Sequence, residues 1–411
     1  MKKAFCVAAG FAVAATGVFA QERDSMRMID MESVQVTSTR AGEKTPIAYT
    51  NVLKEEIKAQ NWGQDLPFLL QMVPSVVVTS DAGSGIGYTS IRIRGTDPTR
   101  INVTSNGIPM NDAESHGLFW VNTPDIAGSA ADIQVQRGVG TSTNGAGAFG
   151  GSINLRTETT PAEPYAEVSG SYGSYDTHKA SIKLGTGLIG GRWSFGGRLT
   201  TIHSDGYVNR ASTDLKSYFV QGGYAYGGTS VRVLVFGGRE RTYHAWDGIA
   251  KDSLETNRRY NPSGEILNDA GDIVGYYKDQ TDNYRLNNYQ AFLTQRLGDN
   301  LFLNLAFHYY KGDGYYEQYK NGEVLARYAL KPFDKVVDGQ TVTVEESNLV
   351  RRKIMDNYFT GGIFSLDYDK GPLRVSLGGA ANISDGKPYG LSLIHLCRCR
   401  RRGQCTCWLL T

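Results

Sequence analysis

Residues Asp132–Thr157 read DIQVQRGVGTSTNGAGAFGGSINLRT and contain the most informative pattern in this chain of 411 residues. An alternating polar and apolar run leads to Arg137-Gly138, and a second alternating run, Ser152–Arg156, follows a turn of small residues. Alternation with a period of two predicts strands. Within the turn, residues 145–150 satisfy G-x-G-x-x-G, a pattern typical of dinucleotide-binding loops. The segment is therefore either a nucleotide-binding loop or a tight hairpin between two strands.

The first 20 residues have the composition of a secretory signal peptide. Lys2 and Lys3 precede the apolar run Ala4–Val18, and Val18-Phe19-Ala20 offers a small-residue cleavage site. The apolar run is shorter than the ~20 residues that a membrane-spanning helix needs. We therefore expect an exported protein with a signal peptide at residues 1–20.

The last residues have a different composition from the rest of the chain. Four of the five cysteines (Cys397, Cys399, Cys405, Cys407) lie there together with four arginines. Their spacing is not a usual zinc pattern, although a metal-binding tail is a second reading. We expect residues 391–411 to be an out-of-frame or artefactual tail without function.

The net charge of the chain argues against nucleic acid as a partner. Setting aside Lys2, Lys3 and the four tail arginines leaves 37 basic and 41 acidic residues in 21–390, a formal charge of −4. A nucleic-acid-binding protein usually carries a basic surface, so we expect no nucleic-acid partner.

Residues 161–390 repeat alternating stretches that are rich in glycine and aromatic residues. In one of them Trp193, Phe195 and Leu199 alternate with Arg198 and Thr200. The stretches are longer than the ~5–6 residues usual for soluble sheets and match the ~9–11 residues of a tilted membrane strand. Tyrosines stand near the ends of several stretches, as in the aromatic girdles of membrane barrels: Tyr172, Tyr175, Tyr207, Tyr309, Tyr310 and Tyr368.

The connections between the stretches alternate in length. Short turns are expected at Ser174, 188–191, 227–228 and 298–300, and long links at Tyr243–Asn283 and Gly312–Asp356. A short-turn rim and a long-loop rim are typical of an outer-membrane barrel rather than of a soluble sandwich. About nine strands fit before Gly390, and plugged barrels have about 22. We therefore expect a chain that is truncated at its C-terminal end.

Residues 41–160 mix helical and strand patterns. Helices are expected at Thr50–Gln60 and Asp65–Met72, and strands at 75–79, 91–94, 102–105, 132–137 and 152–156. This is a compact α+β module of ordinary domain size.

From residue 32 to about 390 the chain resembles a TonB-dependent outer-membrane receptor of the kind found in Bacteroides-like bacteria. Five segments follow the plug pattern in order: Ile93-Arg94-Gly95, Ile101–Val103, Asn106–Pro109, Ile133–Gly138 and Gly150–Asn154. Their key residues are Arg94, Gly95, Gly107, Pro109, Arg137, Gly138, Gly150 and Gly151. The resemblance implies a membrane β-barrel, partial here with about nine antiparallel strands of a presumed 22, and an N-terminal α+β plug domain. It also implies that plug arginines such as Arg94 and Arg137 pair with carboxylates, some of them on the barrel wall.

A TonB box is expected between the signal and the plug, in the flexible segment 21–40. Its residues are Glu32, Ser33, Val34, Gln35, Val36, Thr37, Ser38 and Thr39. A β-prone segment of this kind can add a strand to the edge of a partner sheet, here TonB with its inner-membrane energising complex. A disordered leader is the alternative.

Two plug loops, 80–88 and 111–122, match the segments that face the outside in related receptors. The candidate ligand-binding residues, including four from the loop Tyr243–Asn283, are Ser84, Tyr88, Glu114, His116, Phe119, Trp120, Trp246, Arg258, Arg259 and Tyr260. Packing of Phe119 and Trp120 against the barrel wall is the alternative. The carboxylates Asp269, Asp272, Asp279 and Asp282 lack EF-hand spacing, so we expect a solvated loop and no metal site.

The resemblance implies energy-coupled import of a scarce ligand across the bacterial outer membrane, with membrane lipids, TonB and a small metal chelate as partners. A ferric siderophore is the expected cargo, with cobalamin or haem as alternatives, and a non-transporting binding barrel is a further reading. A nucleotide-binding oxidoreductase would need a helix after Gly150, where the pattern predicts a strand. No nucleophile–base pair or metal-ligand set is recognisable, so we expect neither an enzyme nor a cofactor.

Overall fold

The computed structural model describes residues 40–42, 45–140, 147–337, 339–400 and 404–410. All of these residues lie within one compact unit, Ser33–Thr411. The expected signal peptide, residues 1–20, lies outside the described residues.

Residues 45–157 form the N-terminal domain, built on a five-stranded mixed sheet in the order β1-β6-β7-β4-β5. Its strands are β1 (Ala48–Leu53), β4 (Ile101–Ser105), β5 (Ile108–Pro109), β6 (Ala130–Arg137) and β7 (Gly151–Thr157). β4 and β7 run parallel, and the other pairs are antiparallel. A separate hairpin joins β2 (Val76–Ser80) to β3 (Thr89–Ile93).

The helices of this domain are shorter than the sequence pattern predicts. α1 is Lys54–Gln60 and α2 is Leu66–Leu69, and short 3-10 turns occupy Pro98–Arg100, Trp120–Asn122 and Ile126–Ser129. The expected helix from Thr50 was wrong in its first residues, because Ala48–Leu53 pair with β6 as a strand. Tertiary pairing outweighs the weak helix propensity of this segment.

The segment Asp132–Thr157 is a hairpin of two strands. β6 and β7 pair antiparallel, with Val135 opposite Ile153 and Arg137 opposite Gly151. A β-carbon on Gly151 would lie 2.6 Å from the Gln136 carbonyl oxygen, so the close approach of the two strands requires glycine there. β7 leads into another strand and not into a helix, which removes the dinucleotide reading.

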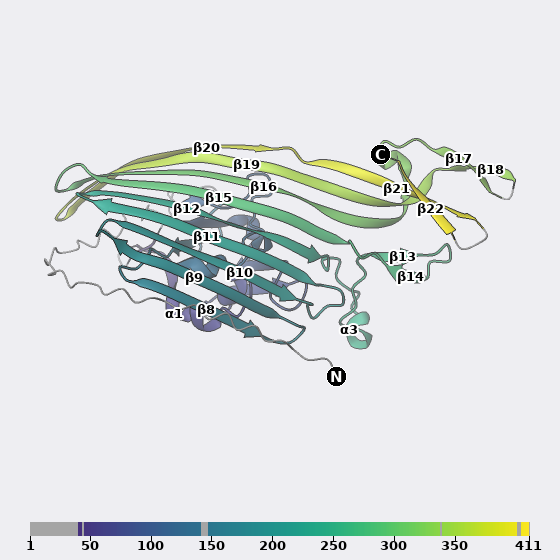
Figure 1. Ribbon diagram of the computed structural model, residues 1–411, viewed down its shortest axis with the longest axis horizontal. Helices are drawn as coiled ribbons and strands as arrows, with labels where there is room; N and C mark the ends of the chain where they lie inside the picture. Colours follow the sequence, from purple (N-terminus) through teal and green to yellow (C-terminus); the bar gives the residue numbers. More distant parts are fainter. Residues whose placement is uncertain (1–39, 43–44, 141–146, 338, 401–403, 411) are drawn as a thin grey trace, which may run out of the picture. The chain divides into compact units, whose positions relative to one another are not determined.

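The rest of the described chain forms one antiparallel sheet of 11 strands, which runs from β8 to β22 (Figure 1). Nine strands precede Gly386, which confirms the expected number: β8 (Pro164–Tyr172), β9 (His178–Ile189), β10 (Trp193–Ser204), β11 (Thr213–Tyr226), β12 (Thr229–Tyr243), β15 (Thr281–Arg296), β16 (Leu301–Val324), β19 (Glu346–Lys370) and β20 (Leu373–Gly386). β21 (Tyr389–Arg400) continues along β19 beyond β20, and β22 (Gln404–Leu410) pairs with β21.

Along the strands of this sheet, apolar side chains are exposed and the polar side chains that alternate with them are buried. On β10 the apolar Phe195 and Leu199 are 48% and 60% exposed, whereas Arg198 and Thr200, which flank Leu199, are 5% and 6% exposed. The same alternation recurs on β12, where Val233 is exposed and Arg232 is buried. A soluble sandwich would bury its apolar face, so an exposed apolar face with a polar interior indicates a sheet whose outer face meets lipid.

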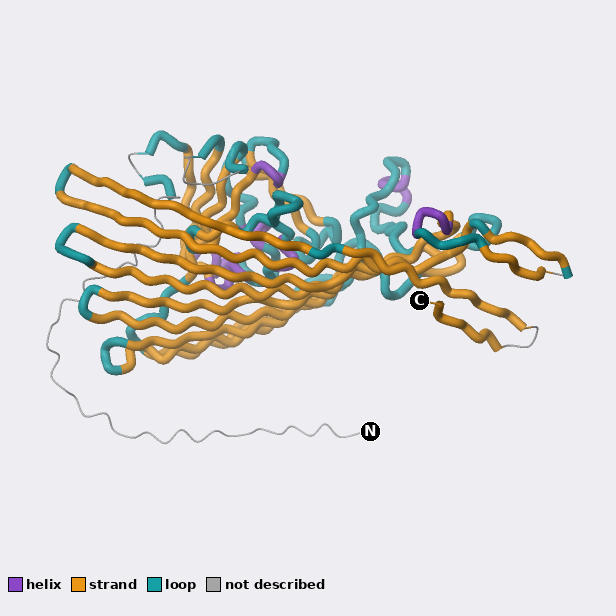
Figure 2. Tube along the Cα trace, turned by 90° about the horizontal axis from the view of Figure 1, so that it is seen from above, coloured by secondary structure: helices purple, strands orange, loops and turns teal. Residues whose placement is uncertain are grey.

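The polar inner face encloses the N-terminal domain, whose loops and helices lie on the concave side of the sheet (Figure 2). The hydrophobic core of the domain continues into the wall, where it includes Phe219, Leu234, Phe236 and Phe292. Among the described residues, none of the helices combines the length and apolarity that a membrane-spanning helix requires.

The two rims of the sheet differ in the length of their connections. Residues 190–192, 227–228, 297–300 and 371–372 make short turns at one rim. Residues 173–177, 205–212, 244–280 and 325–345 form the other, the long-loop rim. The turn at Ser174 is short, as expected, but belongs to the long-loop rim.

The long-loop rim also carries small elements of its own. The connection 244–280 contains α3 (Ser253–Thr256) and the hairpin of β13 (Glu265–Leu267) with β14 (Ile273–Tyr276). The connection 325–345 contains the hairpin of β17 (Phe333–Val337) with β18 (Gln340–Val344).

The expected long link Gly312–Asp356 was wrong, because most of it is strand. β16 and β19 remain paired from Gly312 opposite Asn357 to Val324 opposite Glu346. This stretch includes Tyr315, Tyr316 and Tyr319, and aromatic residues favour extended backbone. The ladder therefore continues past the length needed to cross a bilayer.

Candidate functional site

A cavity of about 890 Å³ lies between the N-terminal domain and the inner face of the sheet, toward the long-loop rim. The domain lines it with two loops, and the sheet lines it with inward-facing side chains of β15, β16 and β19. The lining includes Tyr88, Asp112, Glu114, Leu118, Phe119, Trp246, Tyr284, Leu286, Tyr310, Tyr316, Lys353 and Ile354. Most of these side chains are aromatic or aliphatic, with a few charged groups among them, a composition typical of small-molecule sites.

Tyr88 lines the cavity and links a loop of the N-terminal domain to the sheet. Its hydroxyl donates a hydrogen bond to Asp282 on β15, and its ring packs edge-on against Trp246 at 5.3 Å between centroids. Burial and then the neighbouring carboxylates raise the pKa of the Tyr88 phenol well above its usual value. The phenol therefore stays protonated and remains a donor at neutral pH.

Asp282 was expected in a solvated loop, and the structure corrects this. It is the second residue of β15, is 4% exposed and lines the cavity. The strand begins at Thr281, within the expected link Tyr243–Asn283, because Thr281 already pairs with Tyr243.

Four of the ten candidate ligand-binding residues line this cavity, namely Tyr88, Glu114, Phe119 and Trp246. Phe119 is 51% exposed, whereas its neighbour Trp120 is 5% exposed within the core of the domain. The two aromatic residues therefore point to opposite sides of the loop. Trp120 does not line the cavity, since it begins a 3-10 turn that packs inward.

The other five candidates lie away from the cavity lining. His116 is exposed and has a left-handed φ of 58°, and Ser84 is partly buried in the loop before Tyr88. Arg258 donates to the Leu254 carbonyl, and the Tyr260 hydroxyl bonds Glu265. Arg259 lies over the rings of Tyr175 and Tyr207 at 5.4 and 5.5 Å, so its side chain ties two rim segments together.

Sequence reasoning missed the part of the site that the sheet contributes. Tyr310 was grouped with Tyr309 as a girdle residue, but Tyr310 lines the cavity while Tyr309 is exposed on the outer face. Tyr284, Leu286 and Tyr316 were not singled out. The alternation along the strands could have identified these residues. All of them occupy the side of the strand opposite the lipid-facing side chains.

The plug-motif residues are distributed through the N-terminal domain. Arg94 and Gly95 form a left-handed turn after β3, with φ of 53° and 76°. Gly107 lies in the β4–β5 turn, and Pro109 in β5 pairs with Thr104. Gly138 and Gly150 close the ends of the β6–β7 hairpin through a hydrogen bond of 2.9 Å.

The expected carboxylate partners of Arg94 and Arg137 do not occur in the described part of the chain. Arg137 donates instead to the main-chain carbonyls of Pro74 and Tyr49, at 3.5 and 3.4 Å. Glu32–Thr39, the expected TonB box, lies outside the described residues.

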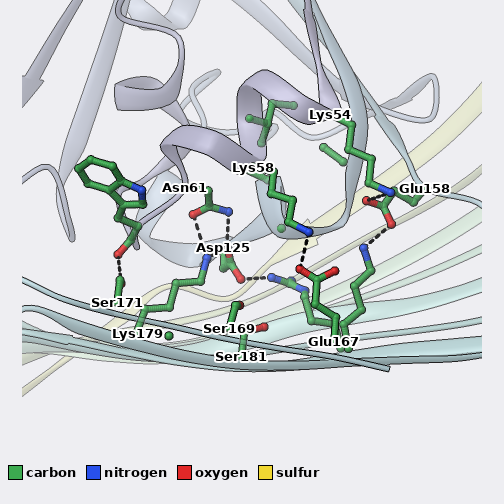
Figure 3. Close-up of a pocket in the computed structure, with 18 residues that line it drawn as sticks. Lys54, Lys58, Asn61, Asp125, Glu158, Glu167, Ser169, Ser171, Lys179 and Ser181 are labelled. Atoms are coloured by element: carbon green, nitrogen blue, oxygen red, sulfur yellow. Dashed lines mark hydrogen bonds and ion pairs between the residues drawn. The ribbon is translucent and has the colours of Figure 1, made fainter. Parts of the chain in front are cut away.

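A buried ion cluster joins the N-terminal domain to the wall (Figure 3). Asp125, at the start of the turn Ile126–Ser129, accepts hydrogen bonds from Lys179 on β9 at 2.8 Å and from Thr200 on β10 at 2.9 Å. It also pairs with Arg198 and accepts a hydrogen bond from Asn61 at 2.9 Å.

The charges of this cluster are almost completely removed from water. The side chains of Asp125, Lys179 and Arg198 are 1%, 7% and 4% exposed. Burial alone would raise the pKa of the Asp125 carboxyl, but Arg198 and Lys179 hold the pKa below its usual range. Asp125 is therefore ionised and compensates two wall cations.

A second group of contacts surrounds Glu158, which follows β7. Glu158 pairs with Lys54 of α1 at 3.2 Å and with Lys183 of β9. Arg232 of β12 donates to the Thr157 hydroxyl at 3.0 Å. Lys58 of α1 pairs with Glu167 of β8 at 2.7 Å. Both these groups and the Asp125 cluster line a cavity of about 220 Å³ (Figure 3).

Comparison with known families identifies the N-terminal domain. Residues 41–152 match the TonB-dependent Receptor Plug Domain. The ferric enterobactin receptor of Pseudomonas aeruginosa is 26% identical over 297 residues, which cover 67% of this chain and 38% of that receptor. The ferrienterobactin receptor of Escherichia coli is 24% identical over 278 residues, which cover 62% of this chain and 35% of that receptor. This chain thus spans little more than a third of the length of these two curated relatives.

Solved structures share the fold at lower sequence identity. The siderophore receptor PiuA from Acinetobacter baumannii superposes with a TM-score of 0.58 at 16% identity, covering 88% of this chain and 48% of that one. Pseudomonas aeruginosa FpvA bound to a ferric pyoverdine gives a TM-score of 0.60 at 13% identity, covering 87% and 44%. The family match identifies a plug domain, and the solved structures show that the fold is that of a plug with part of a β-barrel.

Replacing Asp125 with asparagine tests the ion cluster. Asp125→Asn keeps the shape of the side chain but leaves Lys179 and Arg198 buried without a counter-charge, which costs about 3–5 kcal/mol. We expect the urea concentration at half-unfolding in detergent micelles, followed by tryptophan fluorescence, to fall accordingly. Asp269→Asn, at an exposed loop position, is the matched control. Equal midpoints for the two variants would contradict the cluster's role.

Proposed function

We propose that this chain, which belongs to the TonB-dependent receptor family, forms the plug and adjoining barrel wall of an outer-membrane receptor that imports a ferric siderophore. The ligand binds from outside in the cavity between the plug loops and the wall. The energy for its passage comes from TonB and the inner-membrane complex that drives it. The barrel strands contact outer-membrane lipids, and no step requires enzymatic chemistry.

The composition of the cavity is the observation that carries this proposal. About 890 Å³ of space is lined by aromatic side chains from both the plug and the wall. A siderophore complex is large and amphiphilic, so flat aromatic surfaces can bury its organic shell while a few polar groups fix its orientation. Lys353 and Lys387 also line the cavity and suit an anionic group on the chelate.

Binding in this cavity engages the plug through Tyr88. The Tyr88 ring contacts Trp246 from the loop 244–280, and its hydroxyl bonds Asp282 on the wall. A ligand that displaces Trp246 or competes for Asp282 alters the contacts of the plug loop 81–88. The proposed signal to the periplasmic side begins at this contact.

The names of two relatives support iron as the cargo, since both are receptors for ferric enterobactin. Cobalamin and haem are the alternatives that a binding experiment separates from it. A passive binding barrel is a further alternative, which the coupling experiment below addresses.

A ligand screen tests the cargo. We expect the chain in detergent micelles to bind a ferric catecholate or hydroxamate chelate in preference to cobalamin and haem, as measured by quenching of tryptophan fluorescence. Phe119→Ala and Trp246→Ala should each weaken that binding about tenfold or more, equivalent to ~1.4 kcal/mol. Trp62→Ala, which removes an exposed tryptophan that does not line this cavity, should leave the affinity unchanged. Preferential binding of cobalamin or haem, or full affinity in both cavity variants, would refute the proposed cargo site.

Deletion of residues 32–39 tests the coupling to TonB separately from binding. In cells that depend on the full-length receptor for a ferric chelate, the deletion should abolish uptake of radiolabelled iron. Binding of the same chelate to the cell surface should persist, because the cavity lies on other segments. Continued uptake by the deletion variant would instead favour a passive barrel.

A further inference from the structure

Five side chains with metal-binding chemistry gather at the long-loop rim, on strands other than those that line the cavity. Asp176 lies in the β8–β9 turn, His178 begins β9, His203 and Asp205 stand at the end of β10, and Asp214 follows on β11. The sheet register places His203 between His178 on one neighbouring strand and Asp214 on the other. Three separate segments of the chain thus converge on the His203 imidazole.

The ligand atoms around His203 lie slightly farther apart than those that share an ion. Its Nε2 lies 3.4 Å from Asp205 Oδ1 and 3.9 Å from Asp176 Oδ2. One ligand atom from each of the three residues lies within 4.8 Å of the others. A tetrahedral ion with bonds of ~2.0–2.1 Å separates its ligand atoms by ~3.3 Å, so small side-chain movements bring all three into coordination.

Asp214 orients the imidazole for this role. His203 Nδ1 lies 2.7 Å from Asp214 Oδ1. A proton on Nδ1 donates to that carboxylate and leaves the Nε2 lone pair directed toward Asp205 and Asp176. Metal-binding histidines commonly bond a carboxylate through the nitrogen that does not bind the metal.

The local charge also favours a bound cation. Three carboxylates surround the two imidazoles, and among the described residues the ion pairs of these carboxylates are with histidines alone. Arg241, opposite Asp214 in the sheet, pairs instead with Asp279 at 3.2 Å. Asp176 and Asp205 are exposed, so an ion has direct access from water.

We propose that His203, Asp205 and Asp176 bind a divalent transition-metal ion such as Zn²⁺, with Asp214 as the residue that positions His203. One imidazole nitrogen with two carboxylate oxygens is a donor set that suits Zn²⁺. Ca²⁺ and Mg²⁺ prefer oxygen ligands alone and higher coordination numbers. A water molecule completes the fourth position, and His178, whose ring is 5.1 Å from that of His203, is available as a further donor.

The bound ion would stabilise the rim segment that contacts the plug. The Asp205 amide already donates to the Tyr175 carbonyl at 2.8 Å, which links the β8–β9 turn to the β10–β11 connection. Two residues on, the Tyr207 amide donates to the plug carbonyl of Ala82 at 2.8 Å. The site therefore stabilises the segment that contacts the plug loop carrying Tyr88.

Zinc titration of the full chain tests this site. The tail cysteines are first blocked with iodoacetamide, because thiolates bind Zn²⁺ on their own. ZnCl₂ is then titrated calorimetrically into the chain in detergent micelles, with excess CaCl₂ and MgCl₂ present. We expect one Zn²⁺ per chain, with binding weakened at least about 100-fold by His203→Ala and Asp205→Asn and about 10–100-fold by Asp214→Asn.

Asp299→Asn, an exposed carboxylate at the short-turn rim, is the matched control and should bind Zn²⁺ as the parent chain does. Circular dichroism of each variant verifies that the sheet has formed. Absence of Zn²⁺ binding, displacement of Zn²⁺ by Ca²⁺, or unchanged affinity in His203→Ala would each overturn the proposal.

Discussion

The structure depends on the fact that its large sheet turns apolar side chains outward and polar side chains inward. Lipid can cover Phe195 and Leu199, but it cannot satisfy Arg198, Lys179 or Arg232 on the inner face. A buried cation without a partner costs several kcal/mol. The inner wall therefore requires a polar partner, and the plug supplies it through Asp125, Glu158 and Thr157.

This pairing also fixes where the aromatic cavity lies. The ion clusters attach the plug to β8–β12, while the aromatic cavity opens between the plug loops and β15, β16 and β19. The plug is thus anchored on one side and contacts the cavity on the other. Tyr88 of the plug both lines the cavity and donates a hydrogen bond to Asp282 on the wall. A ligand that binds there acts on a domain whose far side is held by charge pairs.

Much of the fold was predictable from the sequence, because an inside-out strand repeats a simple pattern. The alternation around Trp193–Thr200 predicted a membrane strand, and the lengths of the connections predicted two unlike rims. The β6–β7 hairpin was predictable because a strand, and not a helix, follows Gly150. The expected long link Gly312–Asp356 failed, because polar and aromatic residues extend a ladder as readily as a loop, and only cross-strand pairing with 346–357 distinguishes the two.

The residues of the candidate site were less predictable, for a geometric reason. Phe119 and Trp120 are neighbours of similar chemistry, but a 3-10 turn buries one and exposes the other. Tyr310 differs from Tyr309 only in the face that it occupies. The sequence around Asp125 does not indicate its role, because that role depends on contacts with Lys179 and Arg198, more than 50 residues away. Contacts between distant segments depend on the tertiary fold, and a single sequence does not contain their distances.

The central claim, that alternate residues of one strand face lipid and plug, can be measured directly by spin labelling. A nitroxide is placed at Leu199 or at Thr200 in a chain whose native cysteines are replaced by serine, reconstituted in lipid bilayers. Collision with oxygen, which concentrates in lipid, should be frequent for the Leu199 label. It should be rare for the Thr200 label, where the Asp125 cluster excludes both oxygen and water-soluble nickel complexes. Equal oxygen accessibility at the two positions would contradict the inside-out sheet and the plug that it encloses.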